Sequence, residues 1–179
     1  MSGKRRTVGF SGARVRIIAG EFKGRKLETP PRAAAHVMGE RERAAVFNVL
    51  FSLGVLAEAR VLDVFAGSGA LGLEAISRGA VSVDFVENNP KTREVIKRNA
   101  AALGVEPVKS ESYELIFSDA PYDEPQWELV AKLPGLLAEG GCLVISHSKS
   151  EQIPEFVVAG LKNVYSKTFA AAQIDIFMK

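Results

Sequence analysis

From residue 61 onward, the hydrophobic positions of this chain follow two patterns that take turns along the sequence. Short apolar runs, which are typical of buried strands, lie at 61–66, 81–87, 113–118 and 141–146. Stretches with helical periodicity fall between them, near 70–78, 91–103 and 126–138. Strands that alternate with helices predict a parallel sheet with helices on both faces.

The two ends of the chain carry a different pattern, which predicts antiparallel pairs. Within 14–31, an apolar first strand over 15–19, a turn around 20–24 and a short second strand that ends at Pro30 and Pro31 predict a β-hairpin. A helix follows over 39–52, and the last two strands, 163–170 and 172–179, can pair at the sheet edge. We therefore expect an α/β protein: a three-layer sandwich with a mostly parallel, Rossmann-like sheet and a small N-terminal β-hairpin.

The first strand of the alternating region runs into a glycine-rich loop. Gly67, Gly69 and Gly72 stand in the spacing G-x-G-x-x-G within "RVLDVFAGSGALGLEAISRG". Glycines at these positions let the backbone approach a ligand closely and open the helix that follows. This fingerprint is usually written for dinucleotides, and S-adenosylmethionine pockets begin in the same way. The glycines alone leave both cofactors open.

Two carboxylates beside this loop bear on the choice of cofactor. Glu87 ends the second strand, where it can accept hydrogen bonds from the ribose of either cofactor. Asp63 lies within the first strand, and a buried carboxylate needs a partner. The amino group and sulfonium of S-adenosylmethionine can offset its charge, although Asp63 could instead cap backbone amides of the loop. Asp63 therefore favours S-adenosylmethionine over NAD.

A second motif, "IFSDAPYDE", stands at the end of the 113–118 strand. Ligands of open α/β sheets bind at the carboxyl ends of strands, and this strand delivers Asp119, Ala120, Pro121 and Tyr122 there. Asp119 and a backbone carbonyl can accept hydrogen bonds from an exocyclic amine, and Tyr122 can stack on a flat base. Pro121 limits the freedom of the turn. The motif predicts methyl transfer to a nucleobase amine, with an ordinary strand-end turn as the alternative.

Charge is unevenly spread, although the net charge is only +2. Residues 1–50 hold eleven Lys and Arg against four Asp and Glu, whereas residues 51–179 hold twelve against seventeen. A basic end of this kind points to nucleic acid, with a solvated basic tail as the alternative. The candidates for RNA contact are Lys23, Arg25, Lys26, Arg41 and Arg43.

Composition limits the remaining classes of protein. Hydrophobic residues make up 47% of the chain, enough for a folded core. No apolar run approaches the roughly 18 residues that a membrane span needs, and the basic N-terminus lacks the apolar region of a secretory signal. One cysteine and two histidines show no disulfide framework and no metal-ligand pattern. We expect a cytoplasmic monomer that binds no membrane and no metal.

Several stretches together resemble the RsmD-type family of 16S rRNA guanine-N2 methyltransferases. The loop "VLDVFAGSGALGLEAISRGA" is very close to that of the family, and "DAPY" resembles its D-P-P-Y. The stretch "RIIAGEFKGRKLETP" resembles its N-terminal hairpin, "ERERAAVFNVL" its first helix and "VDFVENN" its second strand. The resemblance covers nearly the whole chain from Val15. It implies a class I methyltransferase fold and methyl transfer to a guanine amine of 16S rRNA, free or in the assembling small ribosomal subunit.

Together with the motifs, the resemblance divides the chain and assigns its residues. Residues 1–13 are expected to form a flexible basic N-terminus, 14–52 an RNA-facing hairpin and helix, and 53–179 the S-adenosylmethionine-binding domain. The cofactor-binding residues are expected to be Asp63, Phe65, Ala66, Gly67, Ser68, Gly69, Glu87 and Asn88. The catalytic turn is expected to be Asp119, Ala120, Pro121 and Tyr122.

Two departures from the family pattern stand out. Ala120 replaces a proline, which leaves the catalytic turn less rigid. Only fifteen residues separate Gly104 from Asp119, whereas the family fits a third strand, an acidic turn and a helix into this interval. The acid that would hold the adenine amine is therefore not identifiable, with Glu106 and Glu111 as candidates.

Three other functions stay open on the sequence. A DNA adenine-N6 methyltransferase is one, because the same turn serves that amine. A non-catalytic RNA-binding protein on a methyltransferase scaffold is another, because the interval before Asp119 is short. An NAD-dependent enzyme is the third, and both Asp63 and the D-A-P-Y turn speak against it.

Overall fold

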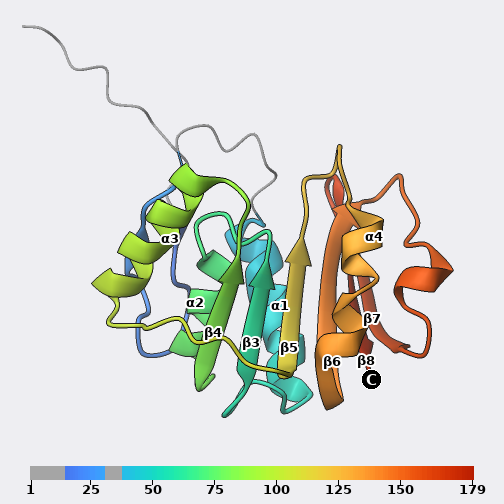
Figure 1. The fold of residues 1–179 in the computed structure, drawn as a ribbon, viewed down its shortest axis with the longest axis horizontal. Coiled ribbons are helices and arrows are strands. Elements are labelled where there is room, and N and C mark those ends of the chain that lie inside the picture. Colours follow the sequence, from blue (N-terminus) through green and yellow to red (C-terminus); the bar gives the residue numbers. More distant parts are fainter. Residues whose placement is uncertain (1–14, 31–37) are drawn as a thin grey trace, which may run out of the picture.

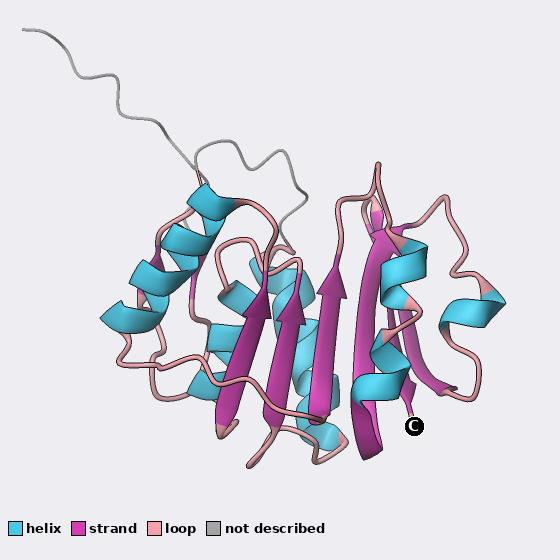
Figure 2. Ribbon diagram, in the orientation of Figure 1, coloured by secondary structure: helices cyan, strands magenta, loops and turns pink. Residues whose placement is uncertain are grey.

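The computed structural model describes residues 15–30 and 38–179. These residues form a six-stranded sheet, a separate two-stranded hairpin, and helices on both faces of the sheet (Figures 1 and 2). The stretch 1–13, expected to be flexible, lies outside the described residues. Among the residues that are described, no helix is both long and apolar enough to cross a membrane.

The large sheet has the strand order β4-β3-β5-β6-β8-β7. Neighbours among its first four strands are parallel, while β8 runs antiparallel to both β6 and β7. This arrangement confirms the expected parallel sheet with an antiparallel pair at one edge. The strands are β3 (Arg60–Val64), β4 (Ser82–Val86), β5 (Tyr113–Asp119), β6 (Leu137–Ser148), β7 (Lys162–Phe169) and β8 (Ala172–Met178).

Three helices cover one face of the sheet, here called the back face. They are α1 (Glu40–Ser52), α2 (Ala70–Ser77) and α3 (Pro90–Ala102). Phe47 of α1 packs against Phe117 of β5 in the largest core cluster, with ring centroids 5.5 Å apart. Asn89 caps α3 by accepting hydrogen bonds from two backbone amides, and Pro90 occupies the first turn, where proline fits.

The opposite face, here called the front face, carries only short elements. They are α4 (Trp127–Val130) and the 3₁₀ turns Leu133–Leu136 and Glu155–Val157. The predicted single helix over 126–138 is therefore wrong. Pro134 has no backbone N–H and its ring clashes with a preceding turn, so it cannot stand inside a continuous helix. The chain instead tightens into a 3₁₀ turn and enters β6 at Leu137.

The interval before β5 holds no strand and no helix. Residues 105–112 cross the front of β4 as an irregular loop and lead into β5 (Figure 1). The Val108 amide donates to the Val83 carbonyl at 2.8 Å, and the Tyr113 hydroxyl donates to Asp84 Oδ2 at 3.1 Å. Because no third strand follows α3, β4 is left at the edge of the sheet.

The N-terminal hairpin is present but short. Its strands are β1 (Val15–Arg16) and β2 (Lys26–Leu27), which pair antiparallel. The first strand stops before the predicted end at residue 19 because the next amides bind α2: Ile18 and Ala19 donate to the Glu74 carboxylate at 2.7 and 3.0 Å. The hairpin is thereby fixed to the back layer of the sheet.

Candidate active site

The two sequence motifs lie side by side because β3 and β5 are parallel neighbours. Val64 pairs with Ser118 in the register of these strands. The glycine loop that follows β3 and the D-A-P-Y turn that follows β5 therefore leave the sheet at the same edge, the one where open α/β sheets bind ligands.

Each glycine of the loop has its own structural reason. Gly67 and Gly69 have φ values of +56° and +78°, which side chains rarely tolerate. A Cβ atom on Gly72 would come within 2.6 Å of the Phe85 ring, so Gly72 lets α2 pack closely on β4. Phe65 also has a positive φ, +62°, although it is not a glycine. The backbone at this loop is thus held in a sharply turned shape.

Glu87 ties the loop to the end of β4. One of its carboxylate oxygens accepts from the Gly67 amide at 3.1 Å and the other from the Asn89 amide at 2.9 Å. Each oxygen has a second lone pair, so the carboxylate can still accept hydrogen bonds from a ribose. Arg93 braces the same turn by donating to the carbonyls of Glu87 and Asn88.

Asp63 is buried on the back side of the sheet, with 1% of its surface exposed. Its Oδ2 accepts from the Gly72 amide at 2.9 Å, so the capping role considered for it from sequence is present. Its Oδ1 is buried and has no hydrogen-bond partner among the described residues. Burial raises the pKa of Asp63 to about 8, although the Gly72 hydrogen bond lowers it. The residue thus combines a structural contact with an unpaired carboxylate oxygen.

Asp119 has a similar environment at the end of β5. Its Oδ1 is buried and finds no hydrogen-bond partner within 15–30 and 38–179. Burial raises its pKa to about 7, while contacts with the Ser146 hydroxyl and the Met38 backbone lower it. Near neutral pH this carboxyl group can therefore exchange between its neutral and charged forms.

A small cavity of about 50 Å³ joins these two acids to Arg43. Arg43 is 1% exposed, and its Nε is a third buried atom without a hydrogen-bond partner in the described chain. Its guanidinium donates to the Arg16 carbonyl at 2.7 Å and lies 3.8 Å from Glu74. A buried side chain cannot reach RNA, so the expected RNA contact of Arg43 is replaced by a place beside Asp63 and Asp119.

The remaining residues of the D-A-P-Y turn lie on either side of the strand end. Ala120 is buried, and Pro121 is half-buried. The Tyr122 hydroxyl lies 2.8 Å from Ser146 Oγ, on β6. Tyr122 lies with Trp127 and His147 in a tight crevice beside the turn. Ser146 thus orients Tyr122, a contact that the sequence did not predict.

A second cavity of about 620 Å³ opens beside the strand ends. It brings together residues that the sequence placed in both motifs: Gly67, Glu87, Asp119 and Pro121. Phe65, Ser68 and Asn88 also line it, whereas Ala66 and Asp63 face the smaller cavity. Its carboxylates, which also include Asp123 and Glu124, favour a ligand with positive charge.

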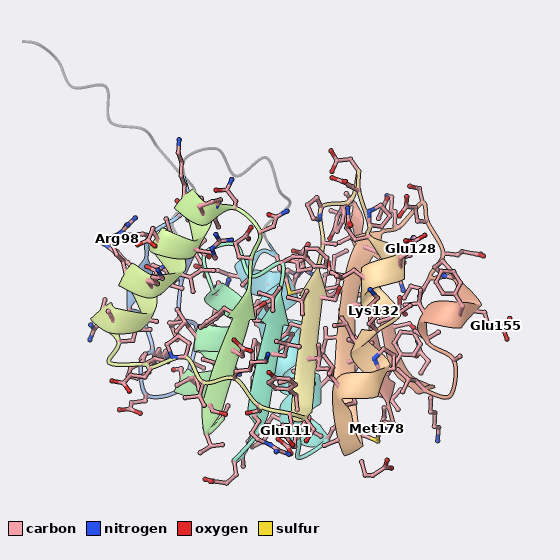
Figure 3. All side chains as sticks on the ribbon, viewed as in Figure 1. Arg98, Glu111, Glu128, Lys132, Glu155 and Met178 are labelled. Carbon is pink, nitrogen blue, oxygen red and sulfur yellow. The ribbon has the colours of Figure 1, made fainter. Side chains whose placement is uncertain are left out.

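Some residues of this cavity carried no signal in the sequence. Thr29 and Pro30 reach it from beyond the hairpin, and Gln126 and Leu129 reach it from α4. Neither candidate for the missing acid lines it. Figure 3 shows Glu111 near the end of the sheet where β5 begins, opposite the edge that carries the motifs.

The other basic candidates are on the surface. Lys23, Arg25 and Lys26 of the hairpin and Arg41 of α1 are exposed. Arg25 also donates to the Ala102 carbonyl at 2.8 Å, which holds the hairpin to the end of α3. These four side chains are accessible to a polyanion, in contrast to Arg43.

Comparison with known proteins agrees with this geometry. A Bacillus subtilis protein named "Putative rRNA methyltransferase YlbH" is 31% identical over 92% of this chain and 99% of its own length. Ribosomal RNA small subunit methyltransferase D of Escherichia coli is 40% identical over 50% of this chain and 44% of its own.

Two solved structures also resemble this chain over at least nine-tenths of its length. The structure titled "Putative methyltransferase yhhF from Escherichia coli" superposes with a TM-score of 0.76 at 26% identity, covering 93% of this chain and 98% of that one. A hypothetical protein of Thermus thermophilus gives 0.75 at 28% identity, covering 90% and 98%. The family described as conserved hypothetical protein 95 matches residues 15–178. The chain therefore belongs to this family, which is the RsmD-type family of rRNA methyltransferases.

Proposed function

We propose that this protein methylates the exocyclic N2 amine of a guanine in 16S rRNA, with S-adenosylmethionine as the methyl donor. One observation carries the proposal. The glycine loop and Glu87, which suit the donor, share a single cavity with Asp119 and Pro121, which suit an acceptor base.

The residues of the site fit this donor. The turned backbone at Gly67 and Gly69 suits close approach to a ligand, and the Glu87 carboxylate keeps lone pairs for a ribose. The unpartnered carboxylate oxygen of Asp63 suits an ammonium group. Bound there, the donor would supply a methyl group on a positively charged sulfur. A wholly neutral or anionic ligand would leave this acid unpaired.

The residues of the chain then act mainly by positioning. Asp119 and the Ala120 carbonyl accept hydrogen bonds from the base amine, which directs the nitrogen lone pair at the methyl carbon. When bound, the donor would give its methyl group to this nitrogen and leave with the electron pair of the sulfur–carbon bond, and the amine would lose a proton to solvent. Tyr122, held by Ser146, lies in the crevice next to this turn, so the wall beside the base would come from Pro121. Orientation of this kind supplies most of the rate enhancement that we assign to the site.

The RNA side of the proposal rests on the exposed basic residues and on the relatives. Lys23, Arg25, Lys26 and Arg41 would contact phosphates. Two of the relatives above carry names that describe rRNA methyltransferases. The target guanine must leave its stack or come from a loop in order to reach the strand ends.

The test is methylation of small-subunit particles with labelled donor, followed by mapping of the modified nucleotide. We expect Asp119→Ala to reduce transfer by at least about a hundredfold, because the amine loses its acceptor, while calorimetry shows that binding of S-adenosylhomocysteine persists. Glu128→Ala, an exposed change on α4, is the matched control and is expected to keep full activity. Undiminished transfer by Asp119→Ala, or methylation of DNA adenine in place of rRNA, would overturn the assignment.

A further inference from the structure

The large cavity has no wall where a third strand would stand. The 105–112 loop crosses β4 at Val83 and Asp84, through the Val108 amide and the Tyr113 hydroxyl. These contacts hold the loop against the middle of β4. The last residue of that strand, Val86, lies beyond them and is 46% exposed. The strand end beside Glu87 is therefore bare on its front side.

The opposite wall of the same cavity comes from α4. Leu129, 39% exposed, lines the cavity together with Val86 and with Val64 of β3. Exposed aliphatic side chains are individually common, but here two of them, from elements far apart in sequence, border one cavity next to a ribose-binding carboxylate. A flat apolar ligand between them would remove both from water.

Gln126 adds a polar group to this wall. Gln126 is the N-cap of α4 and has a φ of +55°. Residues other than glycine and asparagine rarely adopt this left-handed backbone conformation. Its amide carries both a donor and an acceptor, and it lines the cavity with Leu129. Backbone strain at non-glycine residues concentrates at ligand sites.

We propose that α4 supplies the adenine-binding wall that the missing strand does not. The purine ring of the donor lies between Val86 and Leu129, and the Gln126 amide receives the hydrogen bond from the purine amine. This inference rests on the proposed use of S-adenosylmethionine. It assigns to α4 the contact for which the sequence offered only Glu106 and Glu111, neither of which lines the cavity.

Calorimetric titration of the whole protein with S-adenosylhomocysteine tests the inference. We expect Leu129→Ala to weaken binding about five- to tenfold, because part of an aliphatic side chain no longer shields the ring. Leu136→Ala is the matched control, since Leu136 is 38% exposed in the same front layer but does not line the cavity. It is expected to bind like the unchanged protein.

Two changes at position 126 separate the amide from the backbone. Gln126→Gly keeps the positive φ available and removes the side chain, so we expect about threefold weaker binding. Gln126→Asn keeps an amide on a residue that tolerates this conformation. Its affinity for S-adenosylhomocysteine is expected to lie between those of the unchanged protein and Gln126→Gly. Thermal melting of each variant shows that the fold is kept.

The outcomes distinguish this inference from the proposed function. If the unchanged protein binds no S-adenosylhomocysteine at millimolar concentration, the proposed donor is wrong and the inference falls with it. If the unchanged protein binds, and Leu129→Ala and Gln126→Gly bind as Leu136→Ala does, the adenine lies elsewhere and only this inference is overturned.

Discussion

The two faces of the sheet are built in opposite ways. The back face carries three complete helices and the hairpin, and the buried carboxylate of Glu74 on α2 accepts hydrogen bonds from two hairpin amides and from Arg78. The front face carries a four-residue helix, two 3₁₀ turns and the loop 105–112. Figure 3 shows Glu128 and Lys132 on the α4 layer and Arg98 on α3, at the other side of the molecule.

The back face positions charged groups, and the front face leaves room for a ligand. Asp63 and Arg43 are buried on the back side, where helices hold them, whereas the half-buried Asp119 lines both the small cavity and the large one. The reduced front side leaves Val86 and Leu129 exposed around a large cavity. A site that must hold reacting groups rigidly and still admit a large ligand can use a strong face for the first task and an open face for the second.

The largest expected effect is a loss of stability from a change in the back layer. Glu74→Ala would leave Arg43 as an uncompensated buried charge and would free the Ile18 and Ala19 amides of their acceptor. We expect the free energy of unfolding to fall by about 3–5 kcal/mol, the range for breaking a buried ion pair. Urea denaturation measures it, and Glu74→Gln serves if the alanine variant does not fold.

The matched control is an ion pair that is open to solvent. Arg60 and Glu114 pair with each other between β3 and β5, and both side chains are about one-third exposed. Solvent screens this pair, so Glu114→Ala is expected to cost less than about 1 kcal/mol. Equal losses of stability from Glu74→Ala and Glu114→Ala would show that the buried Glu74 carboxylate contributes no more than the solvent-exposed ion pair.

A smaller effect concerns the pH dependence of stability. The pKa values of Asp63 and Asp119, about 8 and about 7, lie above the value of about 4 in an unfolded chain. Between pH 4 and 8 the folded state therefore holds more protons than the unfolded state, and these two groups make stability fall as pH rises. We expect Asp63→Asn to lose less stability than the unchanged chain between pH 5 and pH 8.5, by up to about 1.4 kcal/mol for each pH unit in which only the folded state holds the proton.

Urea unfolding at pH 5, 7 and 8.5 checks this expectation. Asp123→Asn changes an exposed acid of the larger cavity and is expected to leave the pH dependence as it is. The idea fails if Asp63→Asn loses stability between pH 5 and 8.5 as steeply as the unchanged chain.

The smallest effect concerns the surface rather than the two layers. Replacing Lys23, Arg25 and Lys26 together with alanine removes three exposed positive charges from the hairpin. We expect RNA binding to weaken about tenfold at moderate salt and the slope of log affinity against log salt to decrease by about 2. Calorimetry with S-adenosylhomocysteine should show no change.

Binding to a 16S rRNA fragment at several salt concentrations measures the slope. Lys132, Lys149 and Lys162 are exposed on other elements, and their joint replacement is the control. A salt slope that is the same for the hairpin variant and the unchanged chain would place the RNA on another surface.

Much of this architecture was readable from the residues because it rests on local chemistry. The strand–loop–helix at Gly67, the turn at Asp119 and the short hairpin were all predicted, since glycine, proline and periodic apolar positions act through their immediate neighbours. The absence of a third strand was also visible, because the fifteen positions from Gly104 to Asp119 cannot hold a further strand and a helix in addition to β5. The expected helix over 126–138 is absent because Pro134 cannot stand inside a continuous helix.

Other features depended on which elements meet in space. Arg43 looks like any exposed charge on a polar helix, and only the packing of α1 against Glu74 and the strand ends buries it. Gln126 and Leu129 lie at the start of α4 and within it, where the sequence carries no motif, yet they border the cavity that Glu87 also lines. The sequence by itself determined the order of the elements and the two motifs at the strand ends. Tertiary structure alone decided which charges are buried and what walls the cavity, because burial depends on neighbours that lie tens of residues away along the chain.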